Sequence, residues 1–136
     1  MTVRRLCATA AAILIAVCAV VLTTGATALA SGTSDHVYCG AGSASNQCVD
    51  VTVDSSGGQV FSSANALSLG HITVYVEQCR GDLTVCGTIS ANHKDGVYYV
   101  ETSKKPTAFG HVYHGCASFT NGLVRILNVC SGWVTA

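Results

Sequence analysis

The 136-residue chain is poor in proline, in charge and in aromatic side chains. Only 10% of its residues are charged, and the one basic pair after residue 30, Lys104-Lys105, stands beside the single proline, Pro106. Nucleic-acid binding needs clustered lysine and arginine side chains that contact phosphates, so this charge pattern argues against nucleic acid as a partner. With one proline, the turns have to be made by glycine, serine, threonine and asparagine.

The chain also lacks the common short motifs of enzymes. It contains no phosphate-binding loop, no dinucleotide fingerprint and no G-x-S-x-G nucleophile motif. Asp50 and Asp54 would share one face of a strand about 13 Å apart, too far for the usual carboxylate pair of a glycosidase. We therefore expect no catalytic residue, no enzyme activity and no cofactor, although a triad assembled from distant residues stays open.

Metal-binding patterns are equally scarce. No Cys-x-x-Cys pair occurs, and cysteines of an exported protein oxidise readily, which argues against a zinc site. His111 and His114 look like a chelating pair, but residues three apart on a strand point to opposite faces. We expect no metal.

The first thirty residues have the three parts of a secretory signal peptide. Arg4 and Arg5 come first, an uncharged apolar run follows at 6–22, and the segment ends in Ala28-Leu29-Ala30. We expect cleavage between Ala30 and Ser31, which divides the chain into a signal peptide, 1–30, and a secreted domain, 31–136. The alternative is an uncleaved anchor, because the apolar run is just long enough to span a bilayer.

The remaining domain carries seven acidic and five basic residues, a net charge of −2 with histidine neutral. Its apolar runs are strand-sized, so we expect no membrane contact after cleavage. The Ala-, Thr- and Gly-rich signal and the missing N-x-S/T sequon favour a bacterial source. The signal and cysteine layout resembles that of small exported cysteine-paired proteins of actinobacteria.

Cysteines are the most informative residues. Cys7 and Cys18 lie in the signal peptide, and six cysteines remain: Cys39, Cys48, Cys79, Cys86, Cys116 and Cys130. An even set in a small exported domain indicates a disulfide framework, whose connectivity the sequence cannot fix. The spacing favours Cys39–Cys48, Cys79–Cys86 and Cys116–Cys130, worth about 2.5, 2.5 and 3 kcal/mol by loop closure.

Short β-rich runs separated by turn residues make up the rest of the domain, and no helical period occurs outside the signal. Asp54 is expected to cap a turn that follows the first strand. About seven short strands predict a small, monomeric, all-β antiparallel sandwich or barrel. The expected strands are 49–53, 59–67, 71–78, 84–91, 96–101, 111–119 and 123–129.

The first predicted hairpin has a self-consistent register. If Cys79 faces Cys86, Val76 falls opposite Ile89, and apolar residues meet across the strands. The same register places Val74 opposite Ala91.

The second hairpin allows several registers. A type I′ turn at Asn121-Gly122 would put Cys116 and Cys130 on opposite faces. A wider, five-residue loop would oppose Cys116 to Cys130 and Phe119 to Leu127, and we favour it. A bulge at Gly115, or a different pairing of the two cysteines, is the alternative.

Two features suggest binding surfaces. The loop Arg80-Gly81-Asp82-Leu83 would be displayed by the Cys79–Cys86 disulfide, and its first three residues resemble the integrin-binding tripeptide, although Gly-Asp also simply favours a turn. Trp133 is the better candidate for a partly exposed aromatic contact. Of Tyr98 and Tyr99, at least one is expected in the core, because neighbouring residues of a strand face opposite sides.

These observations predict a secreted, non-enzymatic domain of binding or structural character. Its expected partner is an unknown protein or a cell-wall polysaccharide. The alternatives are an inhibitor or toxin that acts through the Cys79–Cys86 loop, and a small extracellular hydrolase with a histidine and a carboxylate brought together by the fold.

Overall fold

The computed structural model describes residues 30–40, 47–122 and 124–136, so the predicted signal peptide lies outside the described residues except for Ala30. The described chain is all-β, as predicted. Its elements are β1 (Ala30–Ser31), β2 (Thr33–Cys39), β3 (Cys48–Asp54), the 3-10 turn η1 (Ser56–Gly58), β4 (Gln59–Arg80), β5 (Cys86–Glu101), β6 (Lys105–Pro106), β7 (His111–Thr120), β8 (Arg125–Cys130) and β9 (Val134–Thr135). Among these residues, no helix is long and apolar enough to cross a membrane.

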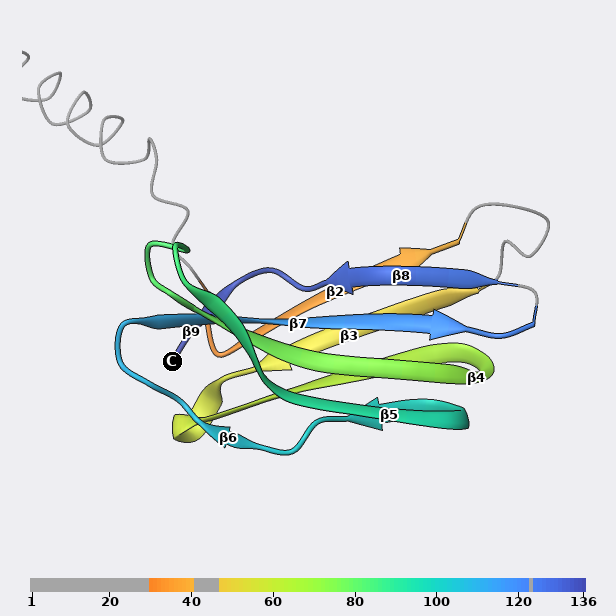
Figure 1. Cartoon of the computed structure of the whole chain (residues 1–136), viewed down its shortest axis with the longest axis horizontal. Coiled ribbons are helices and arrows are strands. Elements are labelled where there is room, and N and C mark those ends of the chain that lie inside the picture. Colours follow the sequence, from red (N-terminus) through yellow and green to blue (C-terminus); the bar gives the residue numbers. More distant parts are fainter. Residues whose placement is uncertain (1–29, 41–46, 123) are drawn as a thin grey trace, which may run out of the picture.

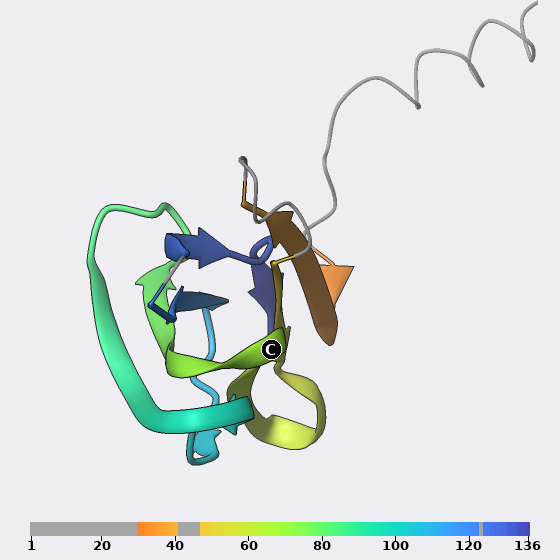
Figure 2. The ribbon, with the colours of Figure 1, turned by 90° about the vertical axis from the view of Figure 1, so that its right-hand side faces the viewer.

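The strands form one sheet that nearly closes into a barrel (Figure 2). Along the sheet the order is β1-β9-β7-β4-β3-β2, with β5 and β6 also paired to β4 and β8 also paired to β7. All pairs are antiparallel except β1 with β9. Because β1 runs into β2 through Gly32, the two ends of the sheet are joined by the chain itself.

A long bent hairpin connects the two halves of the structure (Figure 1). The first half of β4 pairs with β3, and the second half pairs with β7. Strand β5 follows β4 along both halves, with register shifts between Asn65 and Ile72 where the strands bend. The sequence predicts four separate strands here, two for β4 and two for β5, and this was wrong because the backbone pairing continues through the bend.

Alternating valines explain the core. Val49, Val51 and Val53 of β3 are fully buried, while the residues between them are only partly buried. The same period of two runs along β4, from Val60 to Val76. A strand that buries every second side chain fits a sheet with one face on the core and one face outward.

The three predicted disulfides are present. Each joins residues directly opposite one another in an antiparallel pair: Cys39–Cys48 joins β2 to β3, Cys79–Cys86 joins β4 to β5, and Cys116–Cys130 joins β7 to β8. Their Cα–Cα distances are 4.0, 4.1 and 4.0 Å. Each disulfide therefore fixes the register of one strand pair.

The predicted register of the first hairpin is right at the disulfide and wrong beyond it. Val76 lies opposite Ser90, and Val74 lies opposite Asn92. The register shifts between Val76 and Glu77, which leaves Ile89 as an extra residue on β5. Such a bulge bends a strand and increases its twist, and nothing in the alternating pattern indicates it.

The second hairpin pairs Cys116 with Cys130, as the favoured register predicts. The five-residue loop of that register is wrong, because Thr120 pairs with Arg125 and leaves four residues between the strands. Phe119, however, lies opposite Ile126 instead of Leu127, because the register shifts between Ala117 and Phe119. The shift is on β8 at Asn128, where φ is +52°. The Asn128 backbone N–H donates to Ser118 Oγ at 3.1 Å, which stabilises this bulge.

Strand β2 was not predicted. All of its side chains are exposed except that of Ser34, which is partly buried. With no core face, the segment has no alternation of apolar and polar residues for the sequence to reveal.

Candidate functional site

The loop predicted to bind a partner lies at the exposed tip of the β4–β5 hairpin. Arg80 and Leu83 are both exposed, and the Cys79–Cys86 disulfide closes the loop at its base. The Arg80 N–H donates to the Val85 carbonyl at 3.0 Å, and the Leu83 N–H donates to the Arg80 carbonyl at 2.8 Å. The loop is therefore displayed and ordered by its own backbone.

Within this loop, the Asp82 carboxylate already accepts hydrogen bonds from Thr84. Its Oδ1 accepts hydrogen bonds from the Thr84 backbone N–H at 3.1 Å and from the Thr84 hydroxyl at 2.7 Å. These bonds, from the side chain first and the backbone second, lower the pKa of Asp82. Asp82 thus shapes the turn, which is the simpler of the two interpretations of the tripeptide.

A second loop completes this end of the molecule. The Gly81 N–H donates to the Gly110 carbonyl at 2.9 Å, which holds residues 107–110 beside the tip. Phe109 is fully exposed, at 104%, and Leu83 and Val85 are exposed by 51% and 57%. We call residues 80–85 and 107–110 the hairpin end.

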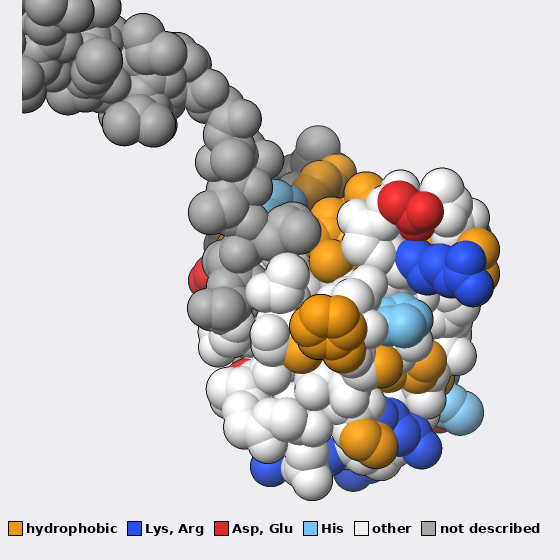
Figure 3. Space-filling model, turned by 90° about the vertical axis from the view of Figure 1, so that its left-hand side faces the viewer, with side chains coloured by type: hydrophobic (Ala, Val, Ile, Leu, Met, Phe, Trp, Pro, Cys, Tyr) orange, Lys and Arg blue, Asp and Glu red, His pale blue; other side chains and the backbone are white. Residues whose placement is uncertain are grey.

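Figure 3 views the molecule from this side: separate hydrophobic side chains lie on the surface, with lysine and arginine side chains toward its margins. A shallow pocket of about 310 Å³ opens at the same end, between Phe109, Gly81 and the C-terminal Ala136. Phe109 was not predicted as a contact residue, because a lone aromatic between predicted strands carries no periodic signal.

Trp133, predicted as a partly exposed aromatic contact, is partly exposed. Its ring stacks on the imidazole of His114, with centroids 3.6 Å apart and planes 11° from parallel. His114 Nε2 lies 2.5 Å from Glu77 Oε2, across the β4–β7 pair. The side chains of His114 and Glu77 are 12% and 32% exposed, so this hydrogen-bonded pair is partly buried beside the indole.

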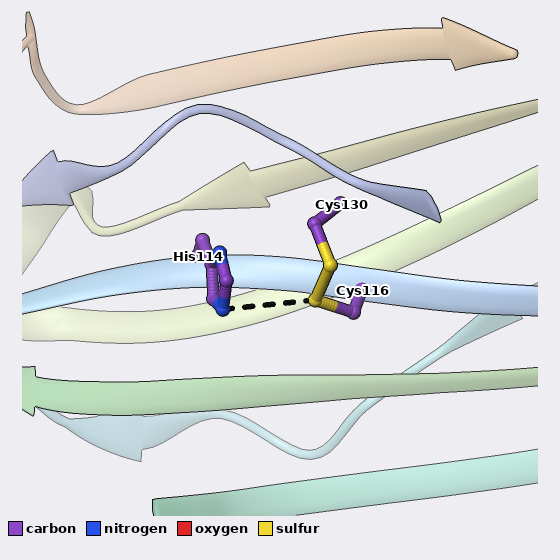
Figure 4. A group of neighbouring side chains, drawn as sticks. All are labelled: His114, Cys116 and Cys130. Atoms are coloured by element: carbon purple, nitrogen blue, oxygen red, sulfur yellow. Dashed lines mark hydrogen bonds between the residues drawn. A yellow bond between two sulfur atoms is a disulfide. The ribbon is translucent and has the colours of Figure 1, made fainter. Parts of the chain in front are cut away.

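The same imidazole nitrogen faces the Cys116–Cys130 disulfide (Figure 4). His114 Nε2 is 3.7 Å from Cys116 Sγ. The possible ligand atoms of His114, Cys116 and Cys130 all lie within 4.8 Å of one another. While the two sulfurs are bonded together they are not thiolates, so the oxidised group does not offer a thiolate metal site. His111 is not part of the group: its Nδ1 lies 3.0 Å from the Phe109 carbonyl oxygen.

Tyr75 lies beside this group, opposite Cys116 in the β4–β7 register. Burial of the phenol raises the pKa of Tyr75, and the charge of Glu77 raises it further. The hydroxyl of Tyr75 therefore stays protonated and can donate a hydrogen bond at neutral pH.

A second histidine–carboxylate pair lies at the bend of the hairpin. His71 Nδ1 is 2.6 Å from Asp95 Oδ1, and its Nε2 is 3.2 Å from the Thr73 hydroxyl. The His93 ring lies 5.8 Å from that of His71, centroid to centroid. This arrangement is that of a nucleophile and its base: the Thr73 hydroxyl would be the nucleophile and the His71 imidazole its base. The Asp95 carboxylate would orient the base. No sequence motif indicates this grouping, because the pairing of β4 with β5 brings the residues together.

The remaining aromatic prediction was wrong. Tyr98 and Tyr99 are 54% and 46% exposed, so neither is in the core. They lie on the outer strand β5, where the chain wraps around the barrel. Asp54, by contrast, caps its turn as predicted: its Oδ1 accepts the Ser56 backbone N–H at 2.8 Å.

We compared the chain with protein-family models, curated proteins and solved structures, and none of them matches it.

Proposed function

We propose that the protein is an exported, non-enzymatic binding domain that holds a protein partner by its hairpin end. The observation that carries this proposal is the full exposure of Phe109 and the half exposure of Leu83 and Val85, on two loops joined by the hydrogen bond from Gly81 to Gly110. Aromatic side chains that project from a surface are typical anchors of protein–protein interfaces, because they bury much apolar area for little lost flexibility.

The stapled loop supports the same proposal. The Cys79–Cys86 disulfide and the hydrogen bond from Gly81 to Gly110 fix the two loops relative to each other. A contact surface that is ordered before binding loses less entropy when the partner arrives. The charged Arg80 side chain beside the apolar residues provides the polar rim that such interfaces have.

Secretion is part of the proposal, because three disulfides form and persist in oxidising compartments. The secretory signal predicted at 1–30 gives the route, and a bacterial cell surface or the surrounding medium gives the place. A chain found intact in the cytosol would contradict this part of the proposal.

The test is capture of partners from medium and cell-wall extract, with matched variants. Leu83→Ser and Phe109→Ser together remove the apolar end. Leu127→Ser is the control, since Leu127 on β8 is 52% exposed, as Leu83 is, but lies away from the hairpin end. We expect a protein retained by the wild type and by the control and lost by the double variant. Recovery of no protein, or the same set with all three chains, would contradict the proposal.

In a second version of this proposal the protein is an inhibitor or toxin, and its binding harms the partner. It predicts that replacing Arg80, Gly81 and Asp82 by alanine abolishes the effect on a target protease or cell. Unchanged potency would remove this version.

Hydrolysis is a second candidate function, favoured by the Asp95–His71–Thr73 arrangement. His71 would take the proton of the Thr73 hydroxyl as it attacks an ester carbonyl. Because the His71 and Asp95 side chains are 41% and 84% exposed, water reaches the group, and we expect activity toward activated esters only.

A chromogenic ester tests this candidate. Thr73→Val preserves the shape of the side chain and removes its hydroxyl, so the rate should fall to background. His93→Gln is the matched control, because His93 touches His71 without joining the hydrogen-bonded chain. A wild-type rate no higher than buffer, or one that Thr73→Val leaves unchanged, would exclude hydrolysis at this site.

A further inference from the structure

One hollow beside the hairpin end has the chemistry of a carboxylate site. We propose that the hollow lined by Arg80 and His111 binds an aspartate or glutamate side chain of the protein partner. An apolar side chain of the partner packs beside it, against Phe109. This inference rests on the proposed function, because it names the chemistry of the partner that the hairpin end would hold.

The guanidinium of Arg80 is free to bind an outside group. Arg80 is exposed, and within the described part of the chain it makes no ion pair and no side-chain hydrogen bond. Asp82, the carboxylate of the same loop, accepts its hydrogen bonds from Thr84 instead. The planar fork of an arginine side chain matches the two oxygens of a carboxylate, so an acidic side chain is the group that suits Arg80 best.

The hollow itself offers donors and no competing acid. It has a volume of about 360 Å³ and lies between the β4–β5 hairpin and the start of β7, where Arg80 is directly opposite His111. Gln78 and Thr88 add an amide and a hydroxyl, and both groups donate hydrogen bonds. No aspartate or glutamate of the described residues lines the hollow. A carboxylate that enters it therefore meets a positive charge and neutral donors.

His111 joins this hollow to a more apolar one. Its Nδ1 lies 3.0 Å from the Phe109 carbonyl oxygen, and because that oxygen only accepts, Nδ1 carries the proton and the ring is held in place. His111 also lines the pocket of about 310 Å³ that opens at Phe109 and Gly81. The two hollows thus share one residue, so an acidic and an apolar side chain that are neighbours in the partner can occupy both.

The backbone around Arg80 is fixed before binding. The Arg80 N–H donates to the Val85 carbonyl at 3.0 Å, and the Arg80 carbonyl accepts from the Leu83 N–H at 2.8 Å. The Cys79–Cys86 disulfide closes the loop beneath these bonds. The partner then has to order little more than the Arg80 side chain, which limits the entropy lost on binding.

A second hollow with the same charged residue types serves as a comparison. It has a volume of about 310 Å³ and is lined by Arg125 of β8 and His36 of β2. In the described part of the chain β2 does not pair with β8, and no disulfide joins them, so the two walls are not tied to each other. We therefore place the carboxylate site at the hairpin end and use Arg125 as the control.

The experiment titrates the full, oxidised chain, isotope-labelled for nuclear magnetic resonance, with two peptides. Acetyl-Phe-Glu-Gly-amide carries one carboxylate, on its glutamate, and acetyl-Phe-Gln-Gly-amide is its uncharged match. The backbone amides of Gly87 and Gly110, which line the two hollows, report binding. We expect the glutamate peptide to bind roughly fivefold more tightly than the glutamine peptide, the upper end of what an exposed ion pair contributes.

Two variants and one control decide the outcome. Arg80→Gln should bind both peptides equally, because it removes the charge and leaves the apolar contact. Phe109→Ser should weaken both peptides by the same factor, because both carry the phenylalanine. Arg125→Gln is the control and should keep the wild-type preference. The dispersion of the amide signals checks that each variant folds.

Three results of the titration would overturn the inference. One is equal affinity of the wild type for the two peptides. Another is a preference for the glutamate peptide that Arg80→Gln retains. The third is a preference that Arg125→Gln loses as fully as Arg80→Gln does, which would indicate a general attraction of anions to any exposed arginine.

Capture from medium and cell-wall extract separates this inference from the proposed function. A partner lost by the Leu83→Ser, Phe109→Ser chain but retained by Arg80→Gln would leave the proposed function standing and overturn the inference. A partner lost by both chains would support the two together. If the wild type captures no partner, the proposed function fails, and the peptide titration still decides the carboxylate site.

Discussion

The indole of Trp133 lies parallel to the imidazole of His114, with ring centroids 3.6 Å apart. This contact ties the segment between β8 and β9 to the middle of β7, and through Glu77 to β4. Three parts of the chain that are distant in sequence thus meet at one ring stack, beside the third disulfide.

Replacing Trp133 by alanine should lower the free energy of unfolding by about 2 kcal/mol, less than for a fully buried tryptophan because the ring is partly exposed. Urea unfolding of the oxidised protein measures the change. Tyr98→Ala is the control, since Tyr98 is 54% exposed and its loss should change stability by no more than roughly 0.5 kcal/mol. Equal midpoints for the two variants would mean that the stacked rings add nothing to stability.

Gly115→Ala should destabilise the protein by about 1–3 kcal/mol, the usual effect of overpacking a filled interior. A methyl group there would collide with the Ser62 side chain and approach the Thr52 carbonyl oxygen at 3.2 Å. The matched control is Gly87→Ala, where nothing lies within 4 Å. Thermal unfolding compares the two, and a Gly115→Ala chain as stable as the control would show that the interior of the barrel is not packed closely here.

Replacing Cys79 and Cys86 by serine removes their disulfide. This change should lower the free energy of unfolding by about 2.5 kcal/mol, as expected for a loop of this length. The hydrogen bond between Gly81 and Gly110 should also become weaker, because the tip is no longer held at its base. Hydrogen exchange of the Gly81 amide measures the local effect, and guanidinium unfolding measures the global one. Unchanged exchange would contradict the role we give the disulfide in ordering the hairpin end.

The carboxylate of Asp54 should account for part of the loss of stability in acid. Hydrogen bonds from the side chain and backbone of Ser56 lower the pKa of Asp54 below its ordinary value of 3.8. A lowered pKa stabilises the folded state fully above that value and less and less as the pH falls through the folded-state pKa. Asp54→Asn should therefore flatten the loss of stability below about pH 4, whereas Asp35→Asn on the exposed β2 should not. Parallel acid curves for wild type and Asp54→Asn would be the contrary result.

The disulfides and the core could be predicted because both follow from local patterns. Cysteines close in sequence link neighbouring strands, and the alternating valines at 49, 51 and 53 indicate a strand with one buried face. The register of each hairpin was right at its cysteines for the same reason. Beyond them, the bulges at Ile89 and Asn128 depend on how the strands twist around the barrel, and the alternating pattern carries no trace of them.

The candidate site was harder to predict than the fold. His114, Glu77 and Trp133 lie on different parts of the chain and meet only because β7 pairs with β4 and the chain after β8 folds back. The Asp95–His71–Thr73 arrangement depends on the bend that joins the two predicted strands within β5. Sequence patterns describe which face a residue takes along its own strand, but not which strand lies beside it.

Three local disulfides hold this small β fold together. Peptide mapping of the native, unreduced protein tests it most directly. The structure predicts fragments linked through Cys39–Cys48, Cys79–Cys86 and Cys116–Cys130, with every one of these six cysteines oxidised. Six free thiols in the native protein, or any other pairing of these six cysteines, would contradict it.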